Sequence, residues 1–412
     1  MLGESFPIVR TAVPGPASRA AVDRLSRTEC PAITARRARR AAAIGAADTD
    51  PIVWDQAVGA NVVDLDGNVY VDLTSGFGVA TVGHRHPAVV AAGQAQLARL
   101  PHAMGDAFPD RARIDLLDAL TARVGFERAI LGLSGSDAVD AAIKTARLAT
   151  GRHRVLSFTG GYHGLAAAPL AALGYHVAAF KEPFAPLLGQ HTSLAPYGGD
   201  WPDLTDFAAV LVEPLQGRGG MRAPPEGWLA RLHAGARAHG ALVIHDEIFS
   251  GLGRTGAWLA TDLRPDILCL GKSLGGGSPL SACLADTAVM NAWGASTGEA
   301  IHTQTFLGHP VGCAMALAAL TVVETEGLVE RARVEGARWA AALARFGPVT
   351  GRGFMLGLHV PDTLRLSRQL LERGWIVLPA GERAECLGLT PPLSTGRPLL
   401  DGFVDTLAEL RG

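Results

Sequence analysis

Two polar residues follow apolar runs that are typical of buried strands. Asp246 comes at the end of ALVIHD (241–246), and Lys272 follows DILCLG (266–271). A lysine at the end of a buried strand is costly unless it is solvated or used, and a lysine with a lowered pKa can attack a carbonyl group. Neighbouring parallel strands would bring both side chains to one edge of a sheet. We therefore expect Asp246 and Lys272 to share a site.

The glycines after Asp246 offer a competing interpretation. Gly251, Gly253 and Gly256 have the G-x-G-x-x-G spacing of a dinucleotide-binding turn. Such a turn must open a helix, and the crossover to the next parallel strand needs about a dozen residues or more. The segment between Gly256 and the next apolar run is short and contains Pro265. We interpret the spacing as accidental, which disfavours a nicotinamide dehydrogenase.

A lysine and a carboxylate at one sheet edge match the needs of pyridoxal 5'-phosphate (PLP). The lysine binds the aldehyde as an imine, and the carboxylate keeps the pyridine nitrogen protonated so that the ring withdraws electrons. Gly135 and Ser136 stand at the start of an amphipathic helix, where free N–H groups favour an anion such as phosphate. An ordinary helix cap explains those two residues equally well.

Composition narrows the function classes. The chain has 412 residues, of which 48% are hydrophobic and 18% charged, as in a globular enzyme of two or three folding units. A net charge of -2, dispersed along the chain, predicts no nucleic-acid or membrane partner. Five well-separated cysteines favour reduced thiols in a cytoplasmic protein and no metal site. The apolar tract from Pro310 is broken by Glu324, so we expect a buried helix there.

The order of predicted elements indicates a mainly parallel sheet. Beyond Gly83, helical stretches alternate with short apolar runs, as in β-α-β units. The helical stretches are 88–100, 111–124, 137–150 and 225–239, and the apolar runs are AILGL, RVLSF, AAVLVEP, ALVIHDE and DILCLGK. Before them, two short strands are predicted around the turn Asp66-Gly67, and ARRARRAAA could form a short basic helix.

Six segments, in order, resemble the class III (subgroup II) aminotransferases of PLP fold type I. This family includes ω-amino acid, 4-aminobutyrate and ornithine aminotransferases and glutamate-1-semialdehyde aminomutase. The segments are GSDAVDAAIKTAR, GGYHG, EPLQGRGG, HDEIFSGLGRTG, LGKSLGGGSPLSA and IHTQTFLGHPVGCA. The resemblance implies an α/β fold: a large domain with a mainly parallel seven-stranded sheet, and a small α/β domain from both termini. It further implies an arm at 1–50, the first part of the small domain at 51–82, the large PLP-binding domain at 83–314, and the rest of the small domain at 315–412.

The resemblance also assigns roles around the cofactor ring. It implies that Lys272 binds the PLP aldehyde and that Asp246 pairs with the pyridine nitrogen. Tyr162 would stack on one face of the ring, and Ile248 would pack on the other. Lys272 would then act as general base and acid, so that an amino group passes from an amine to a carbonyl acceptor.

The phosphate is expected between two chains. The resemblance implies that Gly135 and Ser136 hold it from one subunit and that Thr305 reaches it from the partner, which predicts a homodimer with shared active sites. Phe77 matches a segment that borders the substrate pocket of the family, so it is expected beside the substrate, although a core position would explain it nearly as well.

One departure from the family concerns the substrate. Users of 2-oxoglutarate commonly read L-R-L-x-P-P-L, and that arginine clamps the α-carboxylate of the substrate. Here the segment reads CLGLTPPL, with Gly388 in place of the arginine. Glu213 resembles the glutamate that pairs with this arginine in the family, so it would lack its usual partner. An unpaired buried carboxylate is expensive, so we expect Glu213 to pair with Arg218 or with the substrate's distal ammonium. Glutamate and 2-oxoglutarate would then be poor substrates, unless Arg383 or Arg397 supplies the clamp.

Other readings remain open. The same scaffold supports an aminomutase or an amino-acid racemase or epimerase, and a catalytically silent scaffold is disfavoured because the lysine and aspartate are intact.

Phe249 stands where many family members have a glutamine that contacts the 3-oxygen of the cofactor. The remaining polar candidates are expected to be structural: His84, His86, His163 and Arg254.

Overall fold

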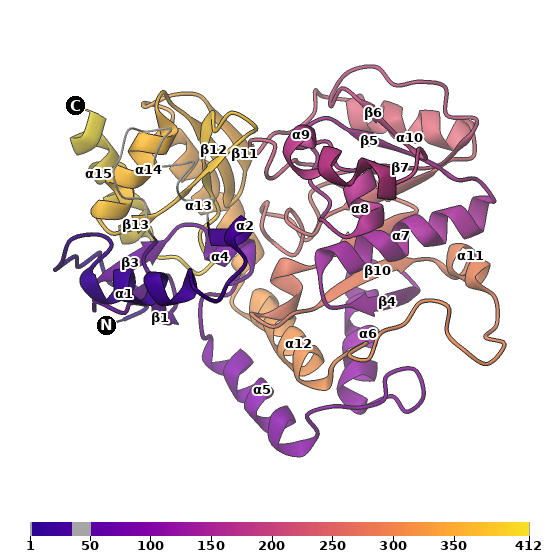
Figure 1. Ribbon diagram of the computed structural model, residues 1–412, viewed down its shortest axis with the longest axis horizontal. Coiled ribbons are helices and arrows are strands. Elements are labelled where there is room, and N and C mark those ends of the chain that lie inside the picture. The colour runs from indigo at the N-terminus through magenta and orange to yellow at the C-terminus, as the bar shows by residue number, and fades with distance from the viewer. Residues whose placement is uncertain (1, 35–50, 412) are drawn as a thin grey trace.

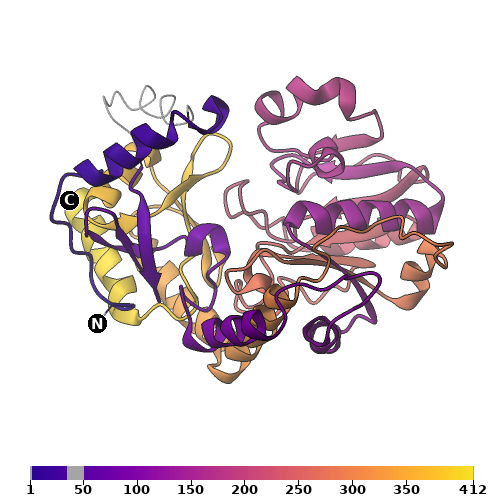
Figure 2. The same ribbon diagram turned by 60° about the horizontal axis from the view of Figure 1, so that its bottom comes forward.

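Two lobes lie side by side in the protein (Figure 1, Figure 2). The computed structural model describes residues 2–34 and 51–411. One lobe contains both termini, and the other contains the middle of the chain. The basic segment ARRARRAAA and part of the predicted arm 1–50 lie outside the described residues.

The middle of the chain forms a seven-stranded sheet in the order β4-β10-β9-β8-β7-β5-β6. Its strands are β4 (Arg128–Gly132), β5 (Arg154–Phe158), β6 (Thr192–Ala195), β7 (Phe207–Val212), β8 (Leu242–Asp246), β9 (Ile267–Leu270) and β10 (Ser281–Ala285). Strands β6, β5, β7, β8 and β9 pair in parallel, and β10 is antiparallel to both of its neighbours. The predicted mainly parallel, seven-stranded sheet is confirmed.

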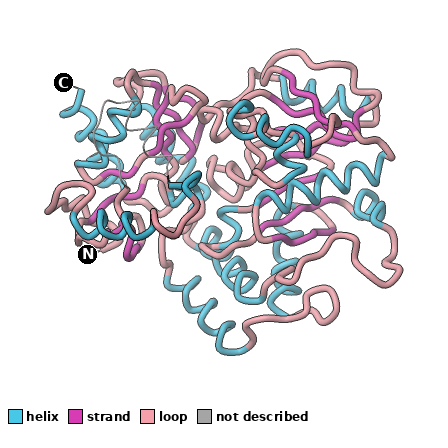
Figure 3. The backbone as a smooth tube through the Cα atoms, viewed as in Figure 1, coloured by secondary structure: helices cyan, strands magenta, loops and turns pink. Residues whose placement is uncertain are grey.

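Helices cover both faces of this sheet (Figure 3). On one face, α7 (Gly135–Thr150) packs through buried alanines, whose small side chains let the helix approach the strands closely. The opposite face is covered by α10 (Trp228–Ala238), α6 (Arg111–Val124) and α12 (Pro310–Thr325). The remaining helices of this part are α5 (Pro87–Arg99), α8 (Ala167–Ala171), α9 (Val177–Phe180), α11 (Thr287–Met290), and the 3-10 turns η1 (Glu182–Leu187), η2 (Lys272–Gly275) and η3 (Asn291–Trp293).

The pleat of β8 decides where its last side chains point. Ile244 packs in the core under α7, and Val243 packs in the core under α10. Because side chains alternate along a strand, Asp246 lies on the α7 face and His245 on the α10 face. His245 accordingly contacts His233 of α10, with 2.8 Å between their Nε2 atoms.

The second lobe contains two four-stranded sheets, in the orders β1-β2-β3-β13 and β11-β12-β15-β14. The strands are β1 (Trp54–Val58), β2 (Asn61–Asp64), β3 (Val69–Asp72), β11 (Val349–Arg352), β12 (Met355–His359), β13 (Trp375–Ile376), β14 (Leu378–Ala380) and β15 (Cys386–Leu389), and the helices are α1 (Pro16–Leu25), α2 (Pro31–Thr34), α4 (Ser75–Gly78), α13 (Leu328–Leu343), α14 (Thr363–Glu372) and α15 (Arg397–Arg411). The two strands predicted around Asp66-Gly67 are confirmed as β2 and β3. Strand β3 pairs in parallel with β13, so segments from both ends of the chain share a sheet. The domain boundaries after residues 50, 82 and 314 stay predictions.

The glycine-rich segment after β8 does not have the structure of a dinucleotide-binding turn. Residues 247–260, which contain the three spaced glycines, form turns and bends, so no helix opens there as a dinucleotide-binding turn would require.

In the described part of the chain, no single helix is long and apolar enough to span a membrane; α12 and α13 reach that length and composition only as a pair, and they are bent by 61°. The same residues contain no group of three or more His, Cys, Asp or Glu side chains arranged to hold a metal ion.

Candidate active site

Asp246 and Lys272 lie at the ends of neighbouring parallel strands. Asp246 is the last residue of β8 and stands beside Cys269 of β9, and Lys272 follows two residues after β9 ends. The predicted meeting of these two residues at one edge of the sheet is confirmed by this register. Lys272 has a left-handed backbone with φ of 42°, a conformation that a non-glycine residue adopts only where its surroundings fix it.

The amine of Lys272 is held in a poorly solvated position. Its Nζ atom lies 3.9 Å from the centroid of the Phe249 ring. Burial lowers the pKa of Lys272 to about 8, although the charges of Asp246 and Glu213 oppose the shift; Arg218 adds to it. A larger fraction of this amine is therefore neutral near pH 7 than for an ordinary lysine, as a nucleophile and proton carrier requires.

Asp246 is positioned by a buried histidine. His163 Nδ1 lies 2.7 Å from Asp246 Oδ2, and both side chains are almost fully buried. Burial alone would lower the pKa of His163, but the hydrogen bond with Asp246 and the nearby carboxylate charges raise it above its ordinary value. The other oxygen of Asp246 accepts the Ile248 N–H at 3.1 Å. His163 was expected to be structural, and its place beside Tyr162 in GGYHG was the local signal that it belongs to the site.

Glu213 follows β7 and is satisfied by the backbone. Its Oε2 accepts the Tyr162 N–H at 3.0 Å, and its Oε1 accepts the Gly217 N–H at 3.1 Å. Burial raises the pKa of Glu213 to about 7. The expected ion pair with Arg218 was wrong: the Arg218 guanidinium carbon lies 4.4 Å over the Tyr162 ring instead. Two N–H donors satisfy the buried carboxylate without Arg218, and its pairing with the distal ammonium of a substrate stays a prediction.

The start of α7 faces the same region. Gly135 and Ser136 are its first two residues, and Ser134 caps the helix by accepting the Asp137 N–H at 3.3 Å. A Cβ atom on Gly135 would lie 3.0 Å from Ile248 Cδ1, so the glycine is needed for close approach. The first N–H groups of a helix have no partner within it, so this corner can bind an anion.

The place of the missing clamp arginine is occupied by apolar side chains. Gly388 is in the middle of β15, and a Cβ atom there would lie 3.0 Å from the Cε atom of Met221. Met221 belongs to a buried apolar cluster with Leu215, Met355, Ala380 and Cys386, against which Phe249 packs. An arginine side chain at position 388 would therefore displace part of this cluster.

Comparisons with known proteins decide the family. A family model described as aminotransferase class-III matches residues 44–410. The chain belongs to the class-III aminotransferases. An acetylornithine aminotransferase from Methanopyrus kandleri is 37% identical over 376 residues, which cover 87% of this chain and 94% of the relative.

Solved structures agree with that assignment. The fold is similar to an ornithine aminotransferase from Toxoplasma gondii, with a TM-score of 0.84, 28% identity, and 95% and 94% of the two chains covered. An amine transaminase from an uncultivated Pseudomonas species, solved in its PLP-bound form, has a TM-score of 0.77 and 29% identity, with 87% and 94% covered. The chain has the type I fold of this family, and it is a PLP-dependent transaminase.

The residues of this class-III aminotransferase fit the cofactor. A lysine with a lowered pKa, a buried carboxylate and a helix N-terminus lie around one corner, where Ile248 contacts the glycines at both Gly135 and Gly271. A Cβ atom on Gly271 would lie 3.2 Å from Ile248 Cγ2. Small residues thus leave Ile248 free to present an apolar surface to a flat ring.

Two predicted site residues are exposed. Phe77 of α4 is 56% exposed. Thr305 is exposed in the turn before α12, and its neighbour Gln304 lies 3.5 Å from Asp137 near the start of α7. In the described part of the chain, neither Phe77 nor Thr305 forms a hydrogen bond or ring contact with another predicted site residue.

The arginines proposed as substitute clamps are located elsewhere. Arg397 forms an ion pair with Glu335 of α13 in the second lobe. Arg383 is exposed, and its backbone N–H bonds to Glu385 at 2.9 Å. Arg397 is thus already paired with a carboxylate, and a substitute clamp from Arg383 stays a prediction.

Arg254 has a structural position, as expected for the G-R-T-G loop. Its guanidinium is fully buried and donates to the Pro391 carbonyl and, at 3.3 Å, to the hydroxyl oxygens of Ser75 and Thr81. Thr81 Oγ1 in turn lies 2.5 Å from Ser273 Oγ, next to Lys272. His84 is also structural, with its Nε2 atom 2.8 Å from Asp72 Oδ2.

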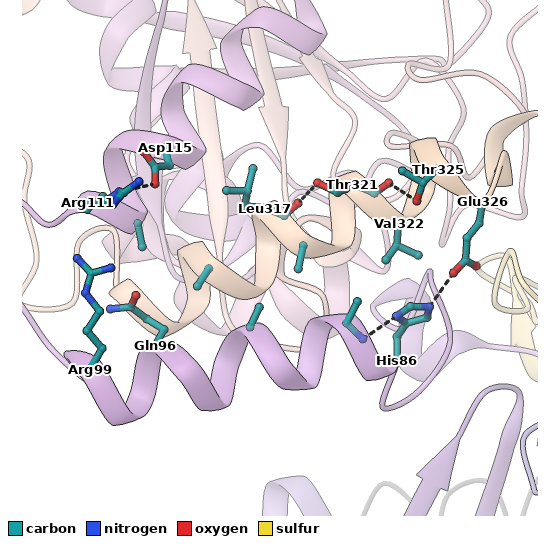
Figure 4. Close-up of a pocket in the computed structure, with 15 residues that line it drawn as sticks. His86, Gln96, Arg99, Arg111, Asp115, Leu317, Thr321, Val322, Thr325 and Glu326 are labelled. Atoms are coloured by element: carbon teal, nitrogen blue, oxygen red, sulfur yellow. Dashed lines mark hydrogen bonds and ion pairs between the residues drawn. The ribbon is translucent and has the colours of Figure 1, made fainter.

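A groove of about 490 Å³ lies away from this site, between α5, α6 and α12 (Figure 4). His86 is at its wall, where its Nδ1 accepts the Ala88 N–H at the start of α5 and its Nε2 lies 3.0 Å from Glu326. Neither Lys272 nor Asp246 lines the groove. The groove is therefore separate from the strand ends that carry Asp246 and Lys272.

Proposed function

We propose that Lys272 binds the aldehyde of PLP and that Asp246, supported by His163, pairs with the pyridine nitrogen. Tyr162 and Ile248 are assigned to the two faces of the ring. The bound cofactor supplies a protonated pyridine ring that withdraws electrons from the substrate carbon. The support is the shared edge of β8 and β9 and the 2.7 Å contact between Asp246 and His163.

Lys272 is also assigned the proton transfers. Once the substrate amine has replaced it, Lys272 Nζ removes the proton from the carbon that bears the amine and later returns a proton. The pKa of about 8 that burial imposes keeps a useful fraction of both forms near neutral pH. Buried Glu213 orders the loop beside it, because its two oxygens hold the N–H groups of Tyr162 and Gly217.

The phosphate is assigned to Gly135 and Ser136, and to Thr305 of the partner subunit in a homodimer. Support for a dimer comes from exposed apolar side chains near Thr305: Met104, Phe108, Ile301 and Phe306. Their two segments are joined by the hydrogen bond from Thr303 to Asp106, at 3.0 Å. We also propose a cytoplasmic location, supported by the presence of all five cysteines as free thiols.

The donor is proposed to be an amine or ω-amino acid whose amine is distant from any α-carboxylate, and the acceptor a carbonyl compound. One observation supports this most: Met221 and its apolar neighbours occupy the place of the clamp arginine at Gly388. Names of the relatives agree with an amine at the end of a chain, because they are acetylornithine and ornithine aminotransferases. Phe77 is assigned to the border of the substrate pocket.

Half-reactions of the purified protein test this proposal. We expect N-acetylornithine, ornithine or 4-aminobutyrate to bleach the cofactor's absorbance faster than L-glutamate does. Equal or faster reaction with L-glutamate would contradict the proposed donor class. Turnover of a single amino acid without any carbonyl acceptor would instead indicate an aminomutase or racemase.

A further inference from the structure

Arg218 lies on an aromatic shelf beside the active site. Its guanidinium carbon is 4.4 Å from the centroid of the Tyr162 ring and 5.7 Å from that of Tyr175. The side chain is half-buried, and its backbone carbonyl accepts the Gly381 N–H at 2.8 Å. A guanidinium stacked on aromatic rings keeps its N–H donors directed outward in the plane of the group.

No carboxylate of the described chain neutralises this guanidinium. Glu213, in the same loop, already accepts two backbone N–H groups. Within residues 2–34 and 51–411, the Arg218 side chain forms no hydrogen bond or ion pair, and its aromatic contacts are with Tyr162 and Tyr175. Arg222, a few residues away, differs because it donates to Gln216 Oε1 at 2.6 Å. Arg218 therefore presents a set of unused donors.

The reactive amine is close to this shelf. Gly217, which precedes Arg218, lies against Phe249: a Cβ atom on the glycine would be 2.2 Å from Phe249 Cδ1. The same Phe249 ring is 3.9 Å from Lys272 Nζ. Burial is the main cause of the lowered pKa of Lys272, and the positive charge of Arg218 lowers it further. The two cations therefore affect each other electrostatically.

The alternative position for a carboxylate is closed. At Gly388, the atoms nearest to an added Cβ atom are Met221 Cε, Ala380 Cβ and the Leu378 carbonyl oxygen, none of which is a cation. A substrate carboxylate would lose its hydration there without gaining a hydrogen-bond donor, which disfavours binding. Near Tyr162 it would meet a planar group with donors in the geometry that a carboxylate accepts.

We propose that Arg218 binds the carboxylate of an amino acid or oxo acid substrate, from the Tyr162 shelf rather than from position 388. This assignment rests on the proposed aminotransferase site and names its ligand class: carboxylates whose reacting amine or carbonyl carbon is separated from the carboxylate. It replaces the pairing of Arg218 with Glu213 that the loop sequence suggested.

Binding of glutarate to the PLP-loaded enzyme tests Arg218 without turnover. Glutarate has carboxylates but no amine, and calorimetry gives its dissociation constant. We expect Arg218→Met to weaken binding about 10- to 100-fold and Arg218→Lys to weaken it less, because lysine keeps the charge but loses the planar fork. The matched control is Arg264→Met, whose guanidinium also lies over an aromatic ring, 4.2 Å from the Phe126 centroid, but pairs with Asp286; it should bind glutarate as the wild type does. Arg383→Met tests the other arginine considered as a clamp. Unchanged binding in Arg218→Met, or weaker binding only in Arg383→Met, would overturn the proposal.

A pair of amines separates this role from a general effect on the reaction. 5-Aminopentanoate and pentylamine differ in the carboxylate alone. We expect Arg218→Met to lower kcat/KM at least tenfold for 5-aminopentanoate and to leave pentylamine within about twofold. An equal loss for both amines would show that Arg218 acts on Lys272 or on folding and would overturn the carboxylate role. If the wild type converts no amine at all, the proposed function fails, whereas glutarate binding still decides the role of Arg218.

Discussion

The amine of Lys272 lies over the ring of Phe249, with Nζ 3.9 Å from the ring centroid. The ring is fixed from two sides, because Cβ atoms on Gly78 and Gly217 would lie 2.4 Å and 2.2 Å from its carbon atoms. An aromatic face attracts an ammonium ion, so Phe249 favours the charged form of Lys272, while burial favours the neutral form. The nearby ring thus moderates the low pKa of the lysine.

Removal of the ring should lower the pKa of Lys272 further. We expect Phe249→Leu to shift it downward by up to about one pH unit, whereas Phe249→Tyr retains the ring and the wild-type value. The pH dependence of PLP uptake by the cofactor-free enzyme measures this shift, because the neutral amine reacts. A midpoint that is unchanged or higher in Phe249→Leu would contradict the argument.

Covalent labelling should identify Lys272 among three lysines. Lys144 forms an ion pair with Asp140 at 2.6 Å, and Lys181 donates to the Ala171 carbonyl at 2.5 Å, so both amines are occupied. After borohydride reduction of the PLP-loaded enzyme, mass spectrometry should find the added mass on the Lys272 peptide. Lys272→Ala should remain unlabelled, and Lys144→Ala should be labelled as the wild type is. A label on either other lysine would refute the assignment.

The pair of His163 and Asp246 should make stability depend on pH. The pKa of His163 is raised in the folded chain. The stability that protonated His163 gives the folded state is therefore fully present below the unfolded pKa and is lost as the pH rises through the folded pKa. From about pH 6.5 upward, the melting temperature of the wild type should fall more than that of His163→Gln. The control is His239→Gln, at an exposed histidine, which should show the same pH dependence of the melting temperature as the wild type. If the melting temperatures of the wild type and His163→Gln change with pH in parallel, the pair does not contribute to the pH dependence of stability.

Restoring the family's arginine should be costly. Gly388→Arg has to displace Met221 Cε, which would lie 3.0 Å from the new Cβ atom. We expect the free energy of unfolding to fall by about 1–3 kcal/mol in denaturant titrations. The double variant Gly388→Arg, Met221→Ala should recover part of that loss, since the smaller side chain makes room. A Gly388→Arg variant as stable as the wild type would show that the cluster adapts freely.

Mixed dimers should reveal whether Thr305 serves the partner's site. Each dimer of a Lys272→Ala chain and a Thr305→Ala chain would contain one intact site if the two residues come from different chains. Random reassociation should then restore about a quarter of wild-type activity, measured at a PLP concentration that does not saturate Thr305→Ala. If both residues serve the same chain, mixing will restore nothing beyond the activity of Thr305→Ala alone.

Some strands of the large sheet were visible in the sequence, and others were not. The apolar runs at 129–133, 154–158, 208–214, 241–247 and 266–272 correspond to β4, β5, β7, β8 and β9. Strand β6 is a half-exposed edge strand of four residues, and β10 consists of SACLA, whose small side chains give little β-propensity. Pairing with neighbours on the sheet, rather than local preference, makes both of them strands.

The site was predictable where it depends on strand ends and less so where it depends on distant contacts. Lys272 and Asp246 follow apolar runs, so their position could be read locally. The place of His163 in GGYHG marks it as a residue of the site, but its contact with Asp246 spans 83 positions of sequence and is not encoded locally. For Glu213 the nearest cation in sequence, Arg218, was a poor guide, because backbone N–H groups of the folded loop reached the carboxylate instead.

The parallel pairing of β3 with β13 also sets an order of events during synthesis. Residues 69–72 of β3 leave the ribosome early, but their partner, residues 375–376, is made near the end of translation. All seven strands of the central sheet lie between residues 128 and 285 and can assemble from one continuous stretch. The large sheet can therefore form on the nascent chain, while β3 must wait for β13 before its own sheet is complete.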